Sequence, residues 1–440
     1  MKYIEISENI ILRIKNKEFR NGSKLPSIRE LSNEYKCNKS TIIKALTQLE
    51  DNHYCYGVPR SGYYVIEKET VNESTMIECD FEHVRIHSEY LPYKEFHHCA
   101  TKAIKSMDSS LYQYGDPKGL LNLREAIYKQ LFDEGIYTDS NRIVMTSGAI
   151  QGINYLLRLI KKQGKSLLIE SPTYSSIVEM IKLLDVDYHC IARNHAAYDF
   201  NDLDEALSRV DYFYIIPNHH NPFGDTLTYE VKQKILKLCI KHDVYLIEDD
   251  YLADIVTDVK VKSLRYYDES NSVIYIRSFS KGFLPGIRLG YVEFPNNYED
   301  LDDFVYIKQF SDLCTSSHNQ YALYYYIQTG MYKRHIHKIR NVYTHRMTIL
   351  KGALASLLPK WVQCNFDRTG IFLYFHFMKK IDDDKLRKLL KKRKIRVAFN
   401  DEFVMHDSNE ITGLRLCVSN YPIDDLLVGL RELIIILDLL

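Results

Sequence analysis

The 440-residue sequence lacks several features that assign many chains to a broad class at once. Its charge is balanced, with 58 basic and 58 acidic residues, so no overall field draws nucleic acid or a membrane toward it. No apolar run reaches the roughly 18 residues of a membrane span, and no secretory signal follows the first charges. We therefore expect a cytoplasmic protein with no membrane partner.

The cysteines and histidines exclude further classes. Nine cysteines are scattered without a C-x-x-C pair, which indicates free thiols in a reducing compartment. The pairs His97-His98 and His219-His220 lack the carboxylate or cysteine spacing of a zinc site. We predict no metal, and the sequence contains no internal repeat or low-complexity tract.

One lysine, Lys281, is distinguished by its surroundings in the segment NSVIYIRSFSKGFLPGIRLGY, residues 271–291. The apolar alternation before it predicts a strand, and the glycines and proline after it predict a loop. An amine at a strand's end, partly withdrawn from water, can lose its proton and condense with an aldehyde. Ser278, Ser280 and Arg288 supply the donors that a phosphate needs. Aldehyde and phosphate together indicate pyridoxal 5′-phosphate, although a lone loop lysine is more often a solvated charge.

Four other apolar strands also lead into turns with polar residues or glycine, at the strand ends where α/β proteins collect their sites. They are Val244–Ile247 with Asp249 and Tyr251, Tyr212–Pro217 with Asn221, Leu167–Ile169 with Tyr174, and Ile143–Met145 with Gly148 and Ala149. Gly148 and Ala149 open an apolar helical pattern, and the free amides of a helix N-terminus favour a phosphate. We predict that these residues and Lys281 form one site.

The S-F-S-K core, with an arginine seven positions on in PGIRLGY, resembles the cofactor-lysine segment of fold-type I aminotransferases. The other segments occur in the family's order, including YQYGDPKG, so the resemblance runs from about residue 80 to the C-terminus. It implies that Asp249 pairs with the pyridine nitrogen, and that Tyr251 and Asn221 hydrogen-bond the ring hydroxyl. It also implies that Tyr174 stacks on the ring, and we interpret Asp250 as structural.

Two positions depart from the family pattern or leave an alternative open. Phe223 stands where the family has threonine, which removes a hydroxyl from the turn after Asn221. Arg415, in the strand GLRLCV, matches the arginine that clamps a substrate carboxylate at two points. A strand-edge arginine is the other interpretation, because Cys417 stands where the family often has glycine and alternation does not say which face Arg415 uses.

The first seventy residues have different patterns. A helical isoleucine stripe covers residues 4–14, and Ser27 with Glu30 can form a capping box at the start of a second helix. A third helical pattern covers residues 42–49, and a hairpin with a basic tip follows at 54–66. Two short helices joined in this way indicate a helix-turn-helix.

This segment closely resembles the winged helix-turn-helix of the GntR regulators, through GSKLPSIRELS, KSTIIKALTQLE and RSGYYV. Between Arg13 and Lys44 nine basic residues stand against three acidic ones, the local excess that a DNA-binding surface needs. The resemblance places contacts with double-stranded DNA at Lys24, Ser27, Arg29, Lys39, Ser40, Thr41, Lys44 and Arg60. Lys24 and Ser27 are expected to contact phosphates rather than bases.

The predicted fold class is α/β, with an N-terminal winged helix-turn-helix and a fold-type I aminotransferase-like domain. We assign residues 1–68 to the first domain, 69–79 to a linker and 80–440 to the second domain. The second domain should have a large, mostly parallel sheet up to about residue 330 and a small α/β part from about 331 to 440.

Together the two domains resemble the MocR subfamily of GntR regulators, which implies a head-to-tail homodimer. The close spacing of Asp249 and Tyr251 supports this subfamily. We favour a transcriptional regulator that holds the cofactor as an internal aldimine on Lys281 and changes its DNA affinity when an amino compound or vitamin B6 binds. The alternative is an active aminotransferase with a fused DNA-binding module, in which Lys281 moves the α-proton and Arg415 holds the substrate.

Overall fold

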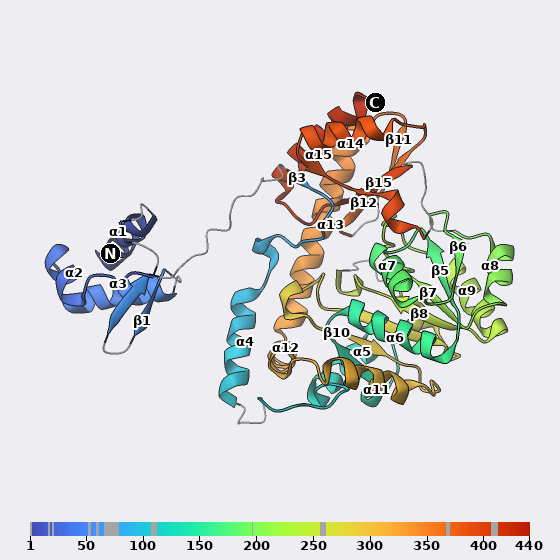
Figure 1. Ribbon diagram of the computed structural model, residues 1–440, viewed down its shortest axis with the longest axis horizontal. Helices are drawn as coiled ribbons and strands as arrows, with labels where there is room; N and C mark the ends of the chain where they lie inside the picture. The colour runs from blue at the N-terminus through green and yellow to red at the C-terminus, as the bar shows by residue number, and fades with distance from the viewer. Residues whose placement is uncertain are drawn as a thin grey trace. The chain divides into compact units, whose positions relative to one another are not determined.

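The computed structural model describes residues 2–15, 18–19, 22–51, 54–58, 61–65, 79–106, 112–195, 197–255, 261–366, 370–405 and 412–440. The chain divides into two compact units, Met1–Met76 and Ile77–Leu440 (Figure 1). The predicted DNA contact Arg60 and residues 69–78 of the predicted linker lie outside the described residues. Cys79 belongs to the first strand of the second unit.

Three helices and a hairpin make up the first unit. They are α1 (Lys2–Lys15), α2 (Ile28–Glu34), α3 (Lys39–Asp51) and the antiparallel strands β1 (Cys55–Val58) and β2 (Gly62–Val65). The capping box is present: Ser27 Oγ accepts from the amide of Glu30 at 3.2 Å, and Glu30 Oε2 accepts from the amide of Ser27 at 2.7 Å. A side-chain cap of this kind stabilises a helix start by about 1 kcal/mol.

One face of each helix and the inner side of the hairpin form the core of the first unit. The buried residues are Ile6, Ile10, Leu25, Leu31, Ile42, Ala45, Leu46, Leu49, Cys55 and Val65. In α3 the buried positions recur every three or four residues, as a helix with one core face requires. Ile43 belongs to the same apolar run in the sequence but has 44% of its surface exposed.

A seven-stranded sheet organises the second unit, in the order β4-β10-β9-β8-β7-β5-β6. The strands are β4 (Ile143–Thr146), β5 (Leu167–Ser171), β6 (Tyr188–Ala192), β7 (Tyr212–Ile215), β8 (Tyr245–Asp249), β9 (Val273–Ser278) and β10 (Gly290–Glu293). Six of these strands point in the same direction, and β10, between β4 and β9, runs against them. The predicted mostly parallel sheet is therefore present.

Helices cover both faces of this sheet. They are α4 (Tyr93–Ser106), α5 (Leu121–Asp133), α6 (Ala149–Gln163), α7 (Ser175–Leu184), α8 (Phe200–Leu207), α9 (Tyr229–His242), α10 (Leu264–Tyr267), α11 (Leu301–Asp312) and α12 (Ser317–Gln328). Along β9, Ile274 and Ile276 pack with α6, α7 and α11, whereas Val273 and Tyr275 pack with the helices of the other face. Burial on both faces is typical of a parallel sheet, and it leaves the strand ends as the places where polar side chains collect.

The small part of the second unit contains a four-stranded antiparallel sheet in the order β11-β12-β15-β14. Its strands are β11 (Val362–Asn365), β12 (Phe372–Phe377), β14 (Ala398–Phe399) and β15 (Gly413–Cys417), and its helices are α14 (Asp383–Lys392) and α15 (Ile423–Asp438). The strand β3 (Cys79–Asp80) also joins this part, because it pairs in parallel with β13 (Ile395–Arg396). The small part thus includes residues from both ends of the unit.

The long helix α13 (Met331–Leu357) connects the large and small parts, as Figure 1 shows. Tyr332 and Ile336 near its start pack in the core that includes β4 and α12, whereas Leu350 and Leu354 pack in the core of the small part. No helix within the described ranges is long and apolar enough to cross a membrane.

Candidate functional site

The loops after β4, β5, β7, β8 and β9 surround one cavity with about 640 Å³ of empty space, part of it open to solvent. Nine of the ten residues predicted to hold the cofactor line it: Ala149, Tyr174, Asn221, Asp249, Tyr251, Ser278, Ser280, Lys281 and Arg288. The tenth, Gly148, directly precedes Ala149. The rest of the lining is apolar and consists of Val84, Ile150, Ile153, Ile216 and Phe372.

At one end of the cavity, Arg288 lies against the start of α6. Its Nη2 donates to the carbonyl of Ser147 at 3.0 Å, and its Nη1 donates to Ser280 Oγ at 3.4 Å. Gly148 precedes the helix with φ +89°, and a Cβ at this position would lie 2.8 Å from Arg288 Nη2. Glycine is therefore needed for the close approach of the guanidinium, which together with the helix amides and Ser278 offers a phosphate several donors.

Asp249, at the end of β8, has one carboxylate oxygen that accepts a hydrogen bond from the described residues and one that does not. Tyr214 Oη donates to Asp249 Oδ2 at 2.8 Å, whereas Oδ1 is buried with no hydrogen-bond partner in the described part of the chain. Burial, together with the neighbouring charge of Asp250, raises the pKa of Asp249 to about 7 despite the Tyr214 hydrogen bond and Lys281. A protonated ring nitrogen in the cavity would supply the missing donor, so this residue fits the pyridine of pyridoxal 5′-phosphate.

Lys281 lies half-buried in the turn after β9. Burial lowers the pKa of its amine, and the charges of Arg415 and Arg288 lower it further, against the opposing effects of Cys417 and Asp249. No residue in the described ranges accepts a hydrogen bond from its Nζ. An amine that is easily deprotonated and has no acceptor suits condensation with an aldehyde.

The loop after β7 positions the two other residues assigned to the ring. Tyr251 Oη donates to the carbonyl of His219 at 2.6 Å, and Asn221 Oδ1 accepts from Arg415 Nη1 at 3.3 Å. The phenol oxygen can still accept a hydrogen bond, and the amide nitrogen of Asn221 can still donate one. Phe223, where a threonine was expected, packs 5.0 Å from Tyr374 and 4.9 Å from His195, measured between ring centroids.

Arg415 is buried on an interior strand, because β15 lies between β12 and β14. The strand-edge interpretation is therefore wrong. Its guanidinium donates to the carbonyl of Glu82 as well as to Asn221, and it lies 4.6 Å from the ring centroid of Phe372. Its Nε is buried without a partner, and among the described residues no carboxylate forms an ion pair with it. It does not line the cavity itself but contacts two residues that do.

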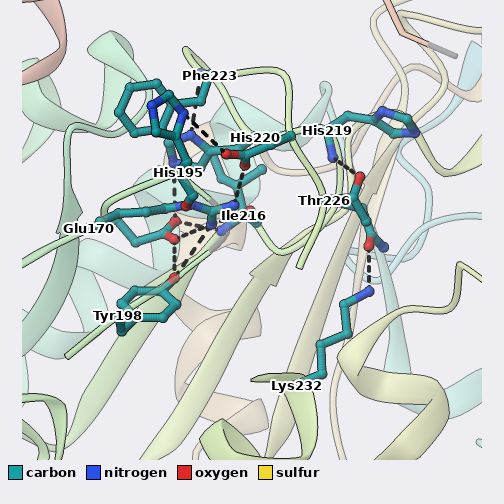
Figure 2. A network of polar contacts seen from close by, with 12 residues as sticks. Glu170, His195, Tyr198, Ile216, His219, His220, Phe223, Thr226 and Lys232 are labelled. Carbon is teal, nitrogen blue, oxygen red and sulfur yellow. Dashed lines mark hydrogen bonds and ion pairs between the residues drawn. The ribbon is translucent and has the colours of Figure 1, made fainter. Parts of the chain in front are cut away.

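Figure 2 shows a buried polar network beneath the loop that carries Asn221. Arg193 Nη1 donates to Glu170 Oε1 at 2.5 Å and to the carbonyl of Ile216 at 3.0 Å, and Nη2 donates to Asp225 Oδ1 at 2.6 Å. Ile216 and Asp225 flank the loop, so one guanidinium joins its two ends. Burial would raise the pKa of Glu170, but Arg193 and His220 lower it to about 2, which keeps it ionised.

Sequence patterns alone had not indicated Tyr214, Glu170 or Arg193 as parts of the site. Glu170 lies near the end of β5 and Arg193 directly follows the neighbouring parallel strand β6, so their pairing depends on the strand order. Tyr214 lies inside an apolar strand, where its ring resembles any core residue. Asp250 accepts from Tyr275 Oη at 2.9 Å and does not line the cavity, which agrees with a structural interpretation.

In the first unit, the predicted DNA contacts that the structure describes lie on α2, on α3 and in the segment just before α2. Lys24, Ser27, Arg29, Lys39, Ser40 and Lys44 are exposed, and Thr41 is half-buried. Ser27 already accepts the cap hydrogen bond, but its hydroxyl can still donate to a phosphate. This part of the first unit therefore exposes cationic side chains together with serine hydroxyls, both of which can bind phosphate groups.

Two family matches account for most of the chain. Residues 88–433 match the family "Aminotransferase class I and II", and residues 2–65 match "Bacterial regulatory proteins, gntR family". The chain belongs to the aminotransferase class I and II family, and its N-terminus is a GntR-type helix-turn-helix. This combination is the MocR-type architecture, as predicted.

Relatives that match over most of their own length are named as HTH-type transcriptional regulators. The chain is 36% identical over 357 residues to the uncharacterized HTH-type transcriptional regulator YcxD of Bacillus subtilis (strain 168), which covers 80% of each chain. It is 26% identical over 412 residues to the HTH-type transcriptional regulator NorG of Staphylococcus aureus (strain USA300), which covers 84% of this chain and 90% of that relative.

Solved structures share the fold of the second unit. Kynurenine aminotransferase of Pyrococcus horikoshii matches with a TM-score of 0.76 and 23% identity, over 83% of this chain and 91% of its own. The α-aminoadipate aminotransferase LysN of Thermus thermophilus, which holds N-(5′-phosphopyridoxyl)-L-leucine, matches with a TM-score of 0.75 and 22% identity, over 82% and 92%. The second unit therefore has the fold-type I aminotransferase fold, whose cofactor is pyridoxal 5′-phosphate.

The raised pKa of Asp249 predicts a pH-dependent effect of Asp249→Asn. The unfolded carboxyl ionises near pH 4, roughly its ordinary value, whereas the folded one keeps its proton up to about pH 7. Wild-type, cofactor-free protein should lose stability as the pH rises from about 4 to about 7, because the Asp249 carboxyl ionises in the unfolded chain but stays protonated in the folded one. In urea unfolding measured from pH 5 to 8, the free energy of unfolding of Asp249→Asn should rise relative to that of the wild type as the pH increases. Parallel pH profiles for the two proteins would contradict the prediction.

Removing the guanidinium beneath the loop should destabilise the second unit. We expect Arg193→Met to lower the free energy of unfolding by about 3–5 kcal/mol, because it leaves Glu170 and Asp225 without their buried cation. Adding Glu170→Gln should restore part of that loss in a double-mutant cycle. Arg209→Met, which removes an exposed pair with Glu205, is the control and should cost under about 1 kcal/mol. Equal losses for the two arginines would argue against the network.

Proposed function

We propose that this protein is a DNA-binding transcriptional regulator whose second unit binds pyridoxal 5′-phosphate and senses an amino compound or a vitamin B6 form. One observation supports this above the others: a single chain joins a cavity centred on Lys281 to a helix-turn-helix with an exposed basic surface. The MocR-type architecture and the regulator names of the relatives agree with it.

The residues of the cavity have separate roles in this proposal. When bound, the cofactor supplies an aldehyde and an electron-withdrawing ring. Arg288, Ser278 and Ser280 bind the phosphate with the amides at the start of α6, and Asp249 holds the proton of the ring nitrogen. Lys281 provides the amine that joins the aldehyde, while Tyr174 and the apolar wall exclude water from the ring.

A ligand in this cavity would touch both parts of the second unit. Phe372 of the small part lines the cavity, and Arg415 of the small part contacts Asn221 of the large part. An effector changes DNA affinity only if it binds two arrangements of the chain unequally. An effector in the cavity can prefer one arrangement, because the large and small parts of the second unit each supply a wall of the cavity and a shift between them changes its shape. Arg415 would attract an effector that carries a carboxylate.

Lys281→Ala tests the cofactor site. We expect the purified protein to take up pyridoxal 5′-phosphate and to show the visible absorbance of a cofactor joined to lysine, and the variant to lack it because the amine is gone. Lys237→Ala, which removes an exposed lysine of α9, is the control and should keep the absorbance. A wild-type protein that stays colourless with added cofactor would contradict the assignment of this cavity as the cofactor site.

The same preparation separates the regulator from an active aminotransferase, which would use the same amine and arginine. With an amino acid and an oxo acid, repeated turnover would favour the enzyme. A spectral change on adding an amino compound, without released product, would favour the sensor.

Lys39→Ala tests the DNA-binding surface. Mobility shifts of the full chain on its own promoter region should weaken, because one phosphate contact is lost, and the slope of log affinity against log salt should fall by about 1. Lys237→Ala again serves as the control and should leave both quantities unchanged. Unchanged affinity for Lys39→Ala would remove this surface from the proposal. The expected head-to-tail homodimer can be checked on the same protein by sedimentation velocity.

A further inference from the structure

One exposed apolar side chain lies in the middle of the proposed DNA-binding surface. Ile43 of α3 has 44% of its surface exposed. Ser40, Lys44 and Thr47 are exposed on the same helix, at spacings of three, one and four residues from Ile43. Residues three and four positions apart share one face of a helix. Ile43 therefore shares the outer face of α3 with the hydroxyls of Ser40 and Thr47, and Lys44 is exposed next to it in the sequence.

The fold of the first unit does not explain this isoleucine. The opposite face of α3 already supplies the core, through Ile42, Ala45, Leu46 and Leu49, each with no exposed surface. An apolar side chain left in water gains stabilisation only when another surface covers it. The surroundings limit the chemistry of that covering surface, because Lys39 and Lys44 are exposed on the same helix, and such cations favour an anionic partner.

The major groove of DNA meets both conditions. Its walls are phosphates, and its floor carries one apolar group that distinguishes a base pair, the C5-methyl group of thymine. We propose that Ile43 contacts a thymine methyl group, so that the operator half-site contains an A·T pair opposite the middle of α3. This inference rests on the proposed DNA-binding function and goes beyond it by naming the base that one residue recognises.

The polar neighbours of Ile43 can make other kinds of contact with the DNA. Lysines can contact phosphates whatever the sequence, and so supply affinity without discrimination. Ser40 and Thr47 can donate to or accept from several bases. An isoleucine can do neither, and its contact with a methyl group is lost when thymine is replaced by uracil or cytosine. A protein partner covering Ile43 would be indifferent to that methyl group.

The experiment combines a change in the protein with a change of one methyl group in the DNA. The preferred site is first selected from a random duplex library with the full-length protein. Each thymine of that site is then replaced by deoxyuridine, which removes the methyl group and keeps the base pairing. For the wild type, we expect one replacement per half-site to weaken binding about fourfold, the effect of uncovering roughly one methyl group.

Ile43→Ala should weaken binding to the thymine site by a similar or larger factor and make the protein insensitive to the same replacement. The two changes would then be coupled in a double-mutant cycle. Leu12→Ala, which truncates another exposed apolar residue of the first unit, 57% exposed on α1, should change neither quantity. Lys44→Ala should weaken binding to the thymine and uracil sites by the same factor.

The two proposals fail in different ways. Selective, salt-dependent binding with independent effects of Ile43→Ala and deoxyuridine would overturn the thymine contact and leave the regulator proposal standing. Unchanged binding by Ile43→Ala would do the same. A wild-type protein that selects no sequence from the library would overturn both.

Discussion

Burial of the large sheet on both faces is the constraint on which the rest of the second unit depends. Helices cover each face, so most strand residues are apolar, and the polar residues of the cavity lie at the strand ends or just beyond them. Because β4, β5, β7, β8 and β9 are mutually parallel, those ends lie at the same side of the sheet. Lys281, Asp249 and Asn221 come from distant parts of the chain and meet there for this reason.

The same burial sets the electrostatics of the cavity. Asp249 and Lys281 both shift toward their neutral forms, since leaving water disfavours either charge. Each also has an atom that the described protein does not satisfy. An unsatisfied acid and a poised amine in one cavity are a cost to the folded chain, and a ligand with a cationic ring and an aldehyde removes that cost.

Beyond the strand ends, the geometry depends on interactions that the sheet does not impose. The loop carrying Asn221 and the carbonyl that meets Tyr251 is held by Arg193, whose guanidinium contacts residues at both ends of it. Two carboxylates, those of Glu170 and Asp225, surround this one buried cation, which also donates to the backbone carbonyls of His195 and Ile216. The loop in turn meets Arg415 of the small part, so the network helps to determine how the two parts fit together.

The two-part organisation, the helix-turn-helix with its capping box, and nearly all of the cavity's polar residues could be predicted from the amino-acid sequence. Hydrophobic period and turn residues act over short stretches of chain and indicated the individual elements, and the order of the motifs along the chain indicated which of them belong to one site. Three features became visible only in the folded chain: Tyr214 supports Asp249, Arg193 joins the ends of a loop, and Arg415 lies on an interior strand. The tertiary structure also decided that Ile42 is buried while the adjacent Ile43 is exposed. These outcomes depend on strand order and on which side of a helix meets the core, and no local pattern of residues specifies either.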